Sequence, residues 1–349
     1  EGSGPVHRLV TAEQRVDEPP DVVLEGETVV FEPVKVLEAR ARFWSSFWGV
    51  RQPDEDIDWL RDIREVARQQ LRVSPPDPID FEQVRECIAK SPPKTGMGSD
   101  FWRVRQWHTL PEQGKDMLVG IFNGIEQGLA FPVQALLNII AIMGKPAGGE
   151  RPICLTTAIY RAYSAIRKTQ VSKWEAQRAG FWDAAVKNST PLKAALVREL
   201  LNEVSVNLKL SVAEILWDME KFYDCLNPAM MSKLALRLEY PVIPLYLGLL
   251  VHRSARVIRL QGSFSDFILP RVSILAGCKQ SVAWTRCFLY DTLEEIHKRF
   301  MPTSVSSWVD DLSQRLSGLR ANVIHTTVEA ATFLASSIHN KGARISPKS

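Results

Sequence analysis

The chain is 349 residues long and 45% hydrophobic, which is enough for a buried core and suggests two or three subdomains. Its formal net charge of +3 argues against a dedicated basic arm, so any polynucleotide would have to be held in a local groove. Five scattered cysteines without CxxC or zinc-ligand spacing argue against a disulfide framework or a zinc module, and favour a reducing compartment.

The N-terminal segment is predicted to be a leader followed by a helical extension. Residues 1–34 are rich in Pro, Glu, Asp and Val without helical periodicity, and they lack the pattern of a signal peptide. Helical periodicity runs over residues 36–72 and includes Trp44, Phe47 and Trp48, which we expect to pack in an interior rather than to stack on bases. Because the first residue is not Met, the chain is expected to be a piece of a longer protein.

Proline-rich breaks separate the elements of the middle third. Residues 74–78 mark a predicted subdomain boundary, and residues 91–96 form a second break. A loop rich in Gly, Pro and Lys occupies residues 144–151. Helices are predicted over residues 81–89, 118–142, 158–174 and 192–204, and a strand over residues 152–155.

The last third alternates more quickly between strand and helix patterns, which predicts an α+β fold. The apolar run at 241–251 is too short to span a membrane and is expected to be a core element. Helices are predicted from Pro228 onward and over residues 280–300 and 322–339. Strands are predicted over residues 212–219, in a hairpin at 257–267 that turns at Gly262, on both sides of Asp310 and Asp311, and at 343–346.

Two acidic segments carry the candidate chemistry. Asp218 stands where an apolar strand ends, and Asp310 and Asp311 stand between hydrophobic flanks. Taken singly, each has an ordinary explanation, an N-cap for the first and a solvated turn for the second. Together they suit phosphoryl transfer, because two Mg²⁺ ions about 3.5–4 Å apart activate the attacking hydroxyl and stabilise the leaving group. Magnesium needs only one or two carboxylates besides water and substrate phosphates.

The order of these segments and of their neighbours resembles the reverse transcriptases of non-LTR retrotransposons and group II introns. The resemblance runs from about residue 90 to residue 349. The pair of acidic motifs is its most specific part. In chain order, the motifs that carry it are Pro92–Asp100, Lys145–Ile153, Asp218–Asp224, Gly277–Ser281, Trp308–Asp311 and Ile345–Ser349.

The resemblance implies a right-hand polymerase with fingers and palm, the palm having an antiparallel sheet packed on helices. The fingers would span residues 79–210 and the palm residues 211–349, after an N-terminal extension over residues 1–78. No thumb is expected within the chain. The implied activity is RNA-directed DNA synthesis, with an RNA template, a DNA primer and dNTPs as partners, no membrane, and the nucleus or cytoplasm as location.

The same resemblance implies roles for single residues. Asp218 and Asp310 would bind two Mg²⁺ ions, for which Mn²⁺ could substitute, and Asp311 would be a weaker ligand beside them. Tyr223 would lie under the sugar of the incoming nucleotide and exclude a 2′-hydroxyl. The remaining nucleotide contacts would come from Lys145 and Arg151 on the triphosphate, Gln280 at the template–nucleotide pair, and Lys348 at the leaving pyrophosphate.

Several of these residues have ordinary alternatives. Tyr223 could simply pack at a helix start, and Gln280 could face solvent at one. The basic residues Arg161, Arg167 and Lys168, interleaved with Tyr160 and Tyr163, could line the template path or form a solvated helix face.

Three positions depart from the family pattern. Ser281 replaces a Gly where the backbone would approach the nucleotide, Arg286 stands in place of a Ser-Pro, and Trp308 replaces a Tyr or Phe. Two other functions therefore stay open. An RNA-directed RNA polymerase is disfavoured by Tyr223, whereas a reverse-transcriptase-like RNA-binding domain without catalysis is favoured by the missing thumb and disfavoured by the intact acidic residues.

Overall fold

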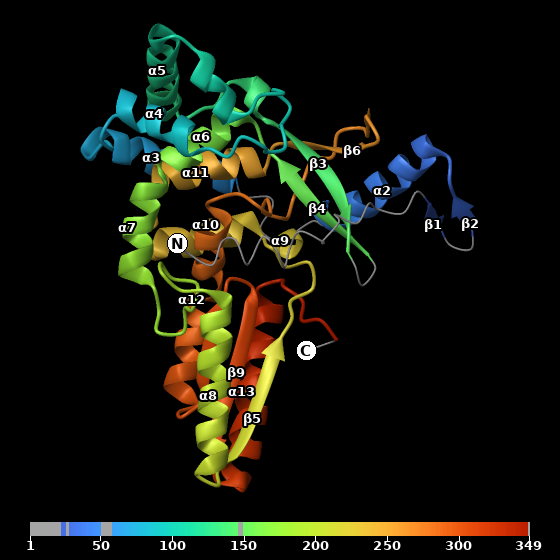
Figure 1. The fold of residues 1–349 in the computed structure, drawn as a ribbon, viewed down its shortest axis with the longest axis vertical. Helices are drawn as coiled ribbons and strands as arrows, with labels where there is room; N and C mark the ends of the chain where they lie inside the picture. The colour runs from blue at the N-terminus through green and yellow to red at the C-terminus, as the bar shows by residue number, and fades with distance from the viewer. Residues whose placement is uncertain (1–21, 26–27, 50–57, 146–148, 348–349) are drawn as a thin grey trace.

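A computed structural model describes residues 22–25, 28–49, 58–145 and 149–347 of the chain. This part is an α+β protein, as predicted, with two main sheets that lie in its upper and lower halves (Figure 1). The N-terminal part holds β1 (Val23–Glu25), β2 (Thr28–Val30), α2 (Pro33–Trp48), α3 (Trp59–Val73), α4 (Phe81–Lys90), the short helix η1 (Val104–Thr109), α5 (Glu112–Gly128) and η2 (Val133–Ala135).

The lower sheet is three-stranded and entirely antiparallel, in the order β5-β9-β8. It is formed by β5 (Ser211–Trp217), β8 (Ser304–Trp308) and β9 (Asp311–Gly318). The helix α13 (Arg320–Asn340) covers one face, where the Gln314 side chain donates to the Thr327 carbonyl oxygen. The helix α8 (Pro191–Asn207) lies on the opposite face (Figure 1).

The upper sheet is four-stranded, in the order β4-β3-β6-β7. Its strands are β3 (Leu137–Gly144), β4 (Glu150–Leu155), β6 (Ala255–Leu260) and β7 (Ser263–Phe264), and only β3 and β6 pair in parallel. The hairpin β6–β7 turns at Gly262, as predicted, where a φ of 88° suits glycine. The boundary at residue 210 stays a prediction, but strands from both sides of it complete this sheet.

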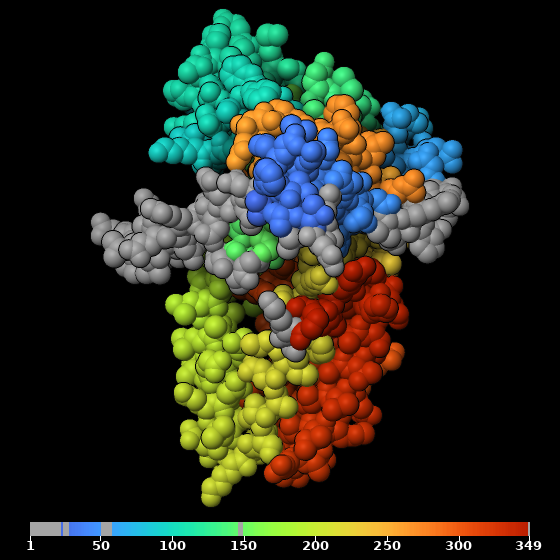
Figure 2. Space-filling view, turned by 90° about the vertical axis from the view of Figure 1, so that its right-hand side faces the viewer, coloured from blue at the N-terminus to red at the C-terminus, as the bar shows by residue number. Residues whose placement is uncertain are grey.

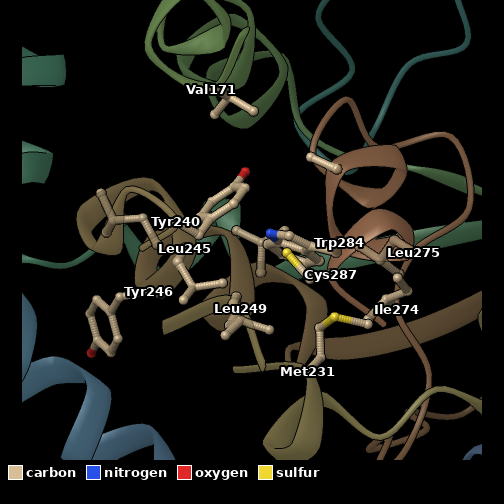
Figure 3. Packing of buried hydrophobic residues seen from close by; sticks show 14 of the residues in the cluster. Val171, Met231, Tyr240, Leu245, Tyr246, Leu249, Ile274, Leu275, Trp284 and Cys287 are labelled. Atoms are coloured by element: carbon tan, nitrogen blue, oxygen red, sulfur yellow. The ribbon is translucent and has the colours of Figure 1, made fainter. Parts of the chain in front are cut away.

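The largest hydrophobic core extends from α3, α4 and α5 to the lower sheet and α13, and it passes through a set of central helices. These are α6 (Ala158–Ile166), α7 (Lys168–Arg178), α9 (Phe222–Cys225), α10 (Pro228–Arg237), α11 (Val242–His252) and α12 (Ser281–Arg299). Figure 3 shows Leu245 and Leu249 of α11 facing Trp284 and Cys287 of α12. The apolar run at 241–251 is therefore a buried helix, which confirms it as a core element. In the part of the chain that the structure describes, no helix is long and apolar enough to cross a membrane.

A smaller core joins α2 to the upper sheet. Trp44 and Trp48 are fully buried there, against Ile140 and Ile258. The Trp48 indole N–H donates to Asp224 at 2.8 Å, and the two indole rings stack with centroids 5.4 Å apart. The aromatic cluster is therefore packed in an interior, as predicted.

Two predicted elements are wrong. The single helix expected over residues 118–142 ends at Gly128, and Leu129 adopts a left-handed conformation. The second half of the segment is β3, whose apolar residues are buried or half-buried on both faces of the strand. Its sequence therefore lacks the alternation of apolar and polar residues that marks a half-buried strand. The strand expected at 343–346 is a single bridge between Met219 and Ile345.

The basic segment at 161–168 forms neither a continuous template surface nor a continuous solvated helix face. Tyr160 and Tyr163 are fully buried, and Arg167 forms a buried ion pair with Glu126, its Nε donating at 2.6 Å. Arg161 donates to the carbonyl oxygen of Gly96 at 2.6 Å. Only Lys168 stays exposed, so the arginines and tyrosines here are structural.

The pair of Glu126 and Arg167 provides a test of stability. Replacing Glu126 with Ala is expected to lower the free energy of unfolding by about 3–5 kcal/mol, because it leaves a buried guanidinium unpaired. The Tyr163 hydroxyl, which donates to Glu126 at 3.0 Å, loses its acceptor as well. Urea unfolding measures the change, and Glu86→Gln serves as control, since Glu86 pairs with Lys90 on the surface and should change stability by at most about 1 kcal/mol. Equal effects of the two variants would contradict the expectation.

Candidate active site

The ends of β5 and of the β8–β9 hairpin bring the two acidic segments together. The ladder between β5 and β9 ends with Trp217 opposite Leu312, so Asp218 lies directly beyond the last pair and next to Asp311. Asp310 occupies the turn of the hairpin, which is closed by the pair Trp308 and Asp311. Three carboxylates from two distant segments of the sequence therefore meet at one end of the lower sheet.

The hairpin turn has an unusual backbone. Val309 has a φ of 61°, a region that a β-branched residue rarely adopts. Two-residue hairpin turns need a positive φ at the first central position, which is normally supplied by Gly or Asn. Such strained residues concentrate at functional sites, where the surrounding structure maintains them. Here the turn places Asp310 directly after the strained residue, at the tip of the β8–β9 hairpin.

Burial and mutual repulsion govern the charges of this cluster. Burial is the main cause that raises the pKa of Asp310, and the carboxylates of Asp311 and Asp218 raise it further, while the Arg151 guanidinium lowers it. The pKa of Asp311 is also raised, by burial and then by Asp218. The cluster therefore holds its negative charges at a cost that a cation would offset.

This cost predicts that the cluster destabilises the metal-free protein. A carboxyl group with a raised pKa costs free energy to ionise in the folded state, and the cost is complete once the pH has risen through the folded pKa. Asp310→Asn should therefore raise the free energy of unfolding near neutral pH by roughly 0.5–2 kcal/mol, and the difference should vanish at about pH 3. Urea unfolding in a chelator measures this.

The matched control is Asp116→Asn, because Asp116 is an exposed residue of α5 at the far end of the molecule. That variant should leave the pH profile unchanged. Added Mg²⁺ should raise the melting temperature of the wild type more than that of Asp310→Asn. A less stable Asp310→Asn protein at neutral pH would show that the carboxylate makes a favourable structural contact instead.

The carboxylates are candidates for holding Mg²⁺, although they do not form a closed cage. Among the described residues, no group of three or more His, Cys, Asp or Glu side chains is arranged as a metal site. Magnesium prefers a few carboxylates together with water and substrate phosphates, and the oxygen donors of Asp218, Asp310 and Asp311 fit this preference. Together these residues could present such an open site to a triphosphate.

Tyr223 lies beside the acidic cluster, at the short helix α9 that follows Asp218. Its ring is largely buried, and burial raises the pKa of the phenol to about 12, with Asp310 and Asp311 contributing. The Tyr223 carbonyl oxygen accepts a hydrogen bond from the Ile274 N–H at 2.9 Å, which fixes the backbone. The neutral ring therefore forms a rigid wall next to the carboxylates.

Lys145 and Arg151 face the cluster from the hairpin of β3 and β4. Arg151 pairs with Met143 across the ladder and lies close enough to Asp310 to lower its pKa. The Lys145 N–H donates to the Gly149 carbonyl oxygen at 3.0 Å, so the loop closes on itself. Both residues are exposed and lie on the side of the upper sheet that faces the acidic cluster.

A cavity of about 850 Å³ separates this loop from Asp218. Lys145, Gly149 and Lys221 line it together with Arg42 and Phe43 of α2. The contribution of α2 is a feature that the sequence did not predict. Its only signal was the basic pair Arg40 and Arg42 next to the aromatic cluster, and Arg40 instead pairs with Glu150 at 2.6 Å.

Of the two interpretations of Gln280, the solvent-facing one is wrong, whereas contact with a template–nucleotide pair stays a prediction. Its side chain is buried rather than facing solvent, and its carboxamide oxygen accepts a hydrogen bond from the Tyr240 hydroxyl at 3.2 Å. The Nε2 atom lies against Gly248 of α11, where an added Cβ would come within 3.1 Å. The carboxamide oxygen is therefore hydrogen-bonded within the helix core, and Gln280 also lines a hollow that it shares with Tyr223 and Lys279.

Two of the three departures from the reverse-transcriptase motifs, Ser281 and Arg286, have structural explanations. The Ser281 hydroxyl is buried and donates to the Leu275 carbonyl oxygen at 2.7 Å. Arg286 is buried as well, paired with Asp183 and with Glu175, the latter at 2.8 Å. These pairs tie α12 to α7 and to the segment that precedes α8.

Three further residues of the implied motifs are Lys348 in the last, Asp100 in the first and Asp224 in the third. Lys348 lies outside the described residues, although Ser346 near it donates its N–H to the Asp218 carbonyl oxygen at 2.7 Å. Asp100 of the first motif caps α6, its side chain accepting from the Ala158 N–H at 2.6 Å. Asp224 accepts from Trp48 and is structural.

Comparison of the chain with models of known protein families finds no match, and comparison with curated proteins finds none either. We therefore infer the function from the geometry of the site.

Proposed function

We propose that this chain is an RNA-directed DNA polymerase, whose fingers span residues 79–210 and whose palm spans residues 211–349. The observation that carries the proposal is the meeting of Asp218 with Asp310 and Asp311 at one end of the β5-β9-β8 sheet. The reaction is attack of a primer 3′-hydroxyl on the α-phosphate of a dNTP, with release of pyrophosphate.

Two Mg²⁺ ions, when bound, would activate the attacking hydroxyl and stabilise the leaving group. Asp218 and Asp310 provide the carboxylates for them, and Asp311 supports the site from the strand edge. Lys145 and Arg151 bind the triphosphate from the opposite side of the cavity, Arg151 being suited to bidentate contact with phosphate oxygens.

The choice of sugar is assigned to Tyr223. Its rigid, neutral ring beside the acidic cluster leaves little room for a 2′-hydroxyl on the incoming nucleotide, and this favours dNTPs over NTPs. The ring thus supports DNA synthesis over the RNA polymerase alternative.

A nucleic-acid groove is supported by a second hollow, of about 960 Å³, which Tyr223 helps to line. Lys168, Lys187 and Lys279 line it. Burial is the main cause that lowers the pKa of Lys279, and the nearby Lys168 lowers it further. A row of phosphates would relieve this repulsion, which fits an RNA template held in a local groove of a chain with little net charge.

Primer extension by the wild-type protein tests the proposal. Oligo(dT) on poly(rA) and on poly(dA) would be offered dTTP or UTP, with Mg²⁺ or Mn²⁺. Extension on poly(rA) with dTTP well above that with UTP is expected. Preference for UTP would favour an RNA polymerase, and binding of the poly(rA) duplex without extension would favour the RNA-binding alternative.

A further inference from the structure

The polar and apolar sides of helix α8 are placed the opposite way from those of an ordinary surface helix. Its side that faces the lower sheet is polar. Arg198 pairs with Glu214 of β5 at 2.9 Å, and Asn202 donates to the same carboxylate at 2.9 Å. On the adjacent strand, Arg315 donates to the Ser205 hydroxyl at 2.6 Å.

The side of α8 that faces solvent is mainly apolar, although Lys193, Glu199 and Glu203 are exposed as well. Figure 1 shows the helix in front of β5 and β9, and in Figure 2 it belongs to the yellow-green margin of the lower half. A soluble helix normally has its apolar stripe on the core and its charges outside, so a large exposed stripe indicates an interaction surface. Six side chains, each between 46% and 78% exposed, form the stripe: Leu192, Leu196, Val197, Leu200, Leu201 and Val204.

The spacing of the stripe suits another helix. Leu192, Leu196, Leu200 and Val204 follow one another at intervals of four residues, and Val197 and Leu201 widen the row. Residues four apart are neighbours on a helix surface, so these side chains form a continuous ridge. Since α8 has 17 residues, the ridge is roughly 25 Å long.

Two charged residues on the same side of α8 as the ridge indicate which helix fits it. Lys193 and Glu203 are exposed and stand at equal distances in sequence before and after Arg198. In a parallel pair of two such helices, each charge would be level with its own copy. In an antiparallel pair, Lys193 of one copy is level with Glu203 of the other, Leu196 is level with Leu200, and the helix dipoles are opposed.

We propose that α8 is a self-association surface, on which two copies of this chain pair through antiparallel α8 helices about a two-fold axis near Arg198. A two-fold interface uses the same patch on both copies, which requires the self-complementary charges that α8 carries. Because a single helix pair is a small interface, the dimer should be weak and should dissociate in the micromolar range.

Sedimentation equilibrium of the whole chain, from about 1 to about 100 µM, tests this proposal. The wild type should shift from monomer to dimer over this range. The double variant Leu196→Glu with Leu200→Glu should stay monomeric and keep the wild-type circular dichroism spectrum and melting temperature, because both side chains are exposed in the monomer. The matched control, Met117→Glu with Leu269→Glu, also replaces two exposed apolar residues and should dimerise like the wild type.

Charge reversal tests the antiparallel register. Lys193→Glu alone and Glu203→Lys alone should each weaken the dimer a few-fold to about tenfold, and the two together should restore it. A wild type that is monomeric throughout, or a dimer that persists in the Leu196→Glu, Leu200→Glu variant, would overturn the proposal. A double reversal that is as weak as the single reversals would overturn the register.

Discussion

Replacing Asp218 with Asn is expected to lower the rate of dTTP addition on an RNA template by about 10³-fold or more. Asp218 and the turn of the β8–β9 hairpin lie side by side at the same end of the lower sheet, so removing either carboxylate leaves the metal ions without one of their anchors. A bound metal supplies several kcal/mol of transition-state stabilisation, and each 1.36 kcal/mol is about a factor of ten in rate.

The two substitutions should not be additive. Asp218→Asn combined with Asp310→Asn should be nearly as slow as either alone, because residues that act as one unit are lost together. Single-turnover extension of a labelled primer measures this. Multiplicative effects, or a residual rate within about tenfold of the wild type, would show that the two carboxylates do not share a metal site.

Replacing Tyr223 with Ala is the second change with a large expected effect. It should raise the use of UTP relative to dTTP by about 10- to 100-fold, because the space of the ring becomes available to the 2′-hydroxyl. The phenol itself is not required, since burial raises its pKa to about 12 and it stays neutral.

Tyr223→Phe is the matched control for this prediction. It keeps the ring and should keep the wild-type preference for dTTP, measured as the ratio of kcat/KM values for the two nucleotides. If Tyr223→Phe relaxes the preference as much as Tyr223→Ala does, the hydroxyl rather than the ring selects the sugar, and steric exclusion is wrong.

The parts of the site that the sequence predicted well are local. The hairpin around Asp310 and the strand before Asp218 follow from alternation of apolar and polar residues over a few positions. The helix that begins at Pro228 follows from the Pro itself, and Asn227 caps it by accepting from the Ala229 N–H at 2.8 Å. Turn and cap chemistry are written within a few residues, so they can be read without knowing the fold.

The parts that the sequence did not predict depend on distant partners. Gln280 is buried because its side chain accepts a hydrogen bond from Tyr240 and packs against Gly248, both distant in sequence. Arg167 is structural because Glu126 lies opposite it. The sequence predicts helix at β3 because a strand buried on both faces has no alternation of apolar and polar residues. For α8, the sequence indicated a helix but not which side of it faces the sheet.

RNA-directed DNA synthesis that depends on Asp310 is best tested by extension of oligo(dT) on poly(rA). The wild type and Asp310→Asn would be compared with dTTP and Mg²⁺ or Mn²⁺. Asp116→Asn serves as control, and all three proteins would first be shown to be folded and to bind the duplex. We expect extension by the wild type and by Asp116→Asn, and none by Asp310→Asn. Equal extension by Asp310→Asn and the wild type, or none by a folded wild type that binds the duplex, would contradict this expectation.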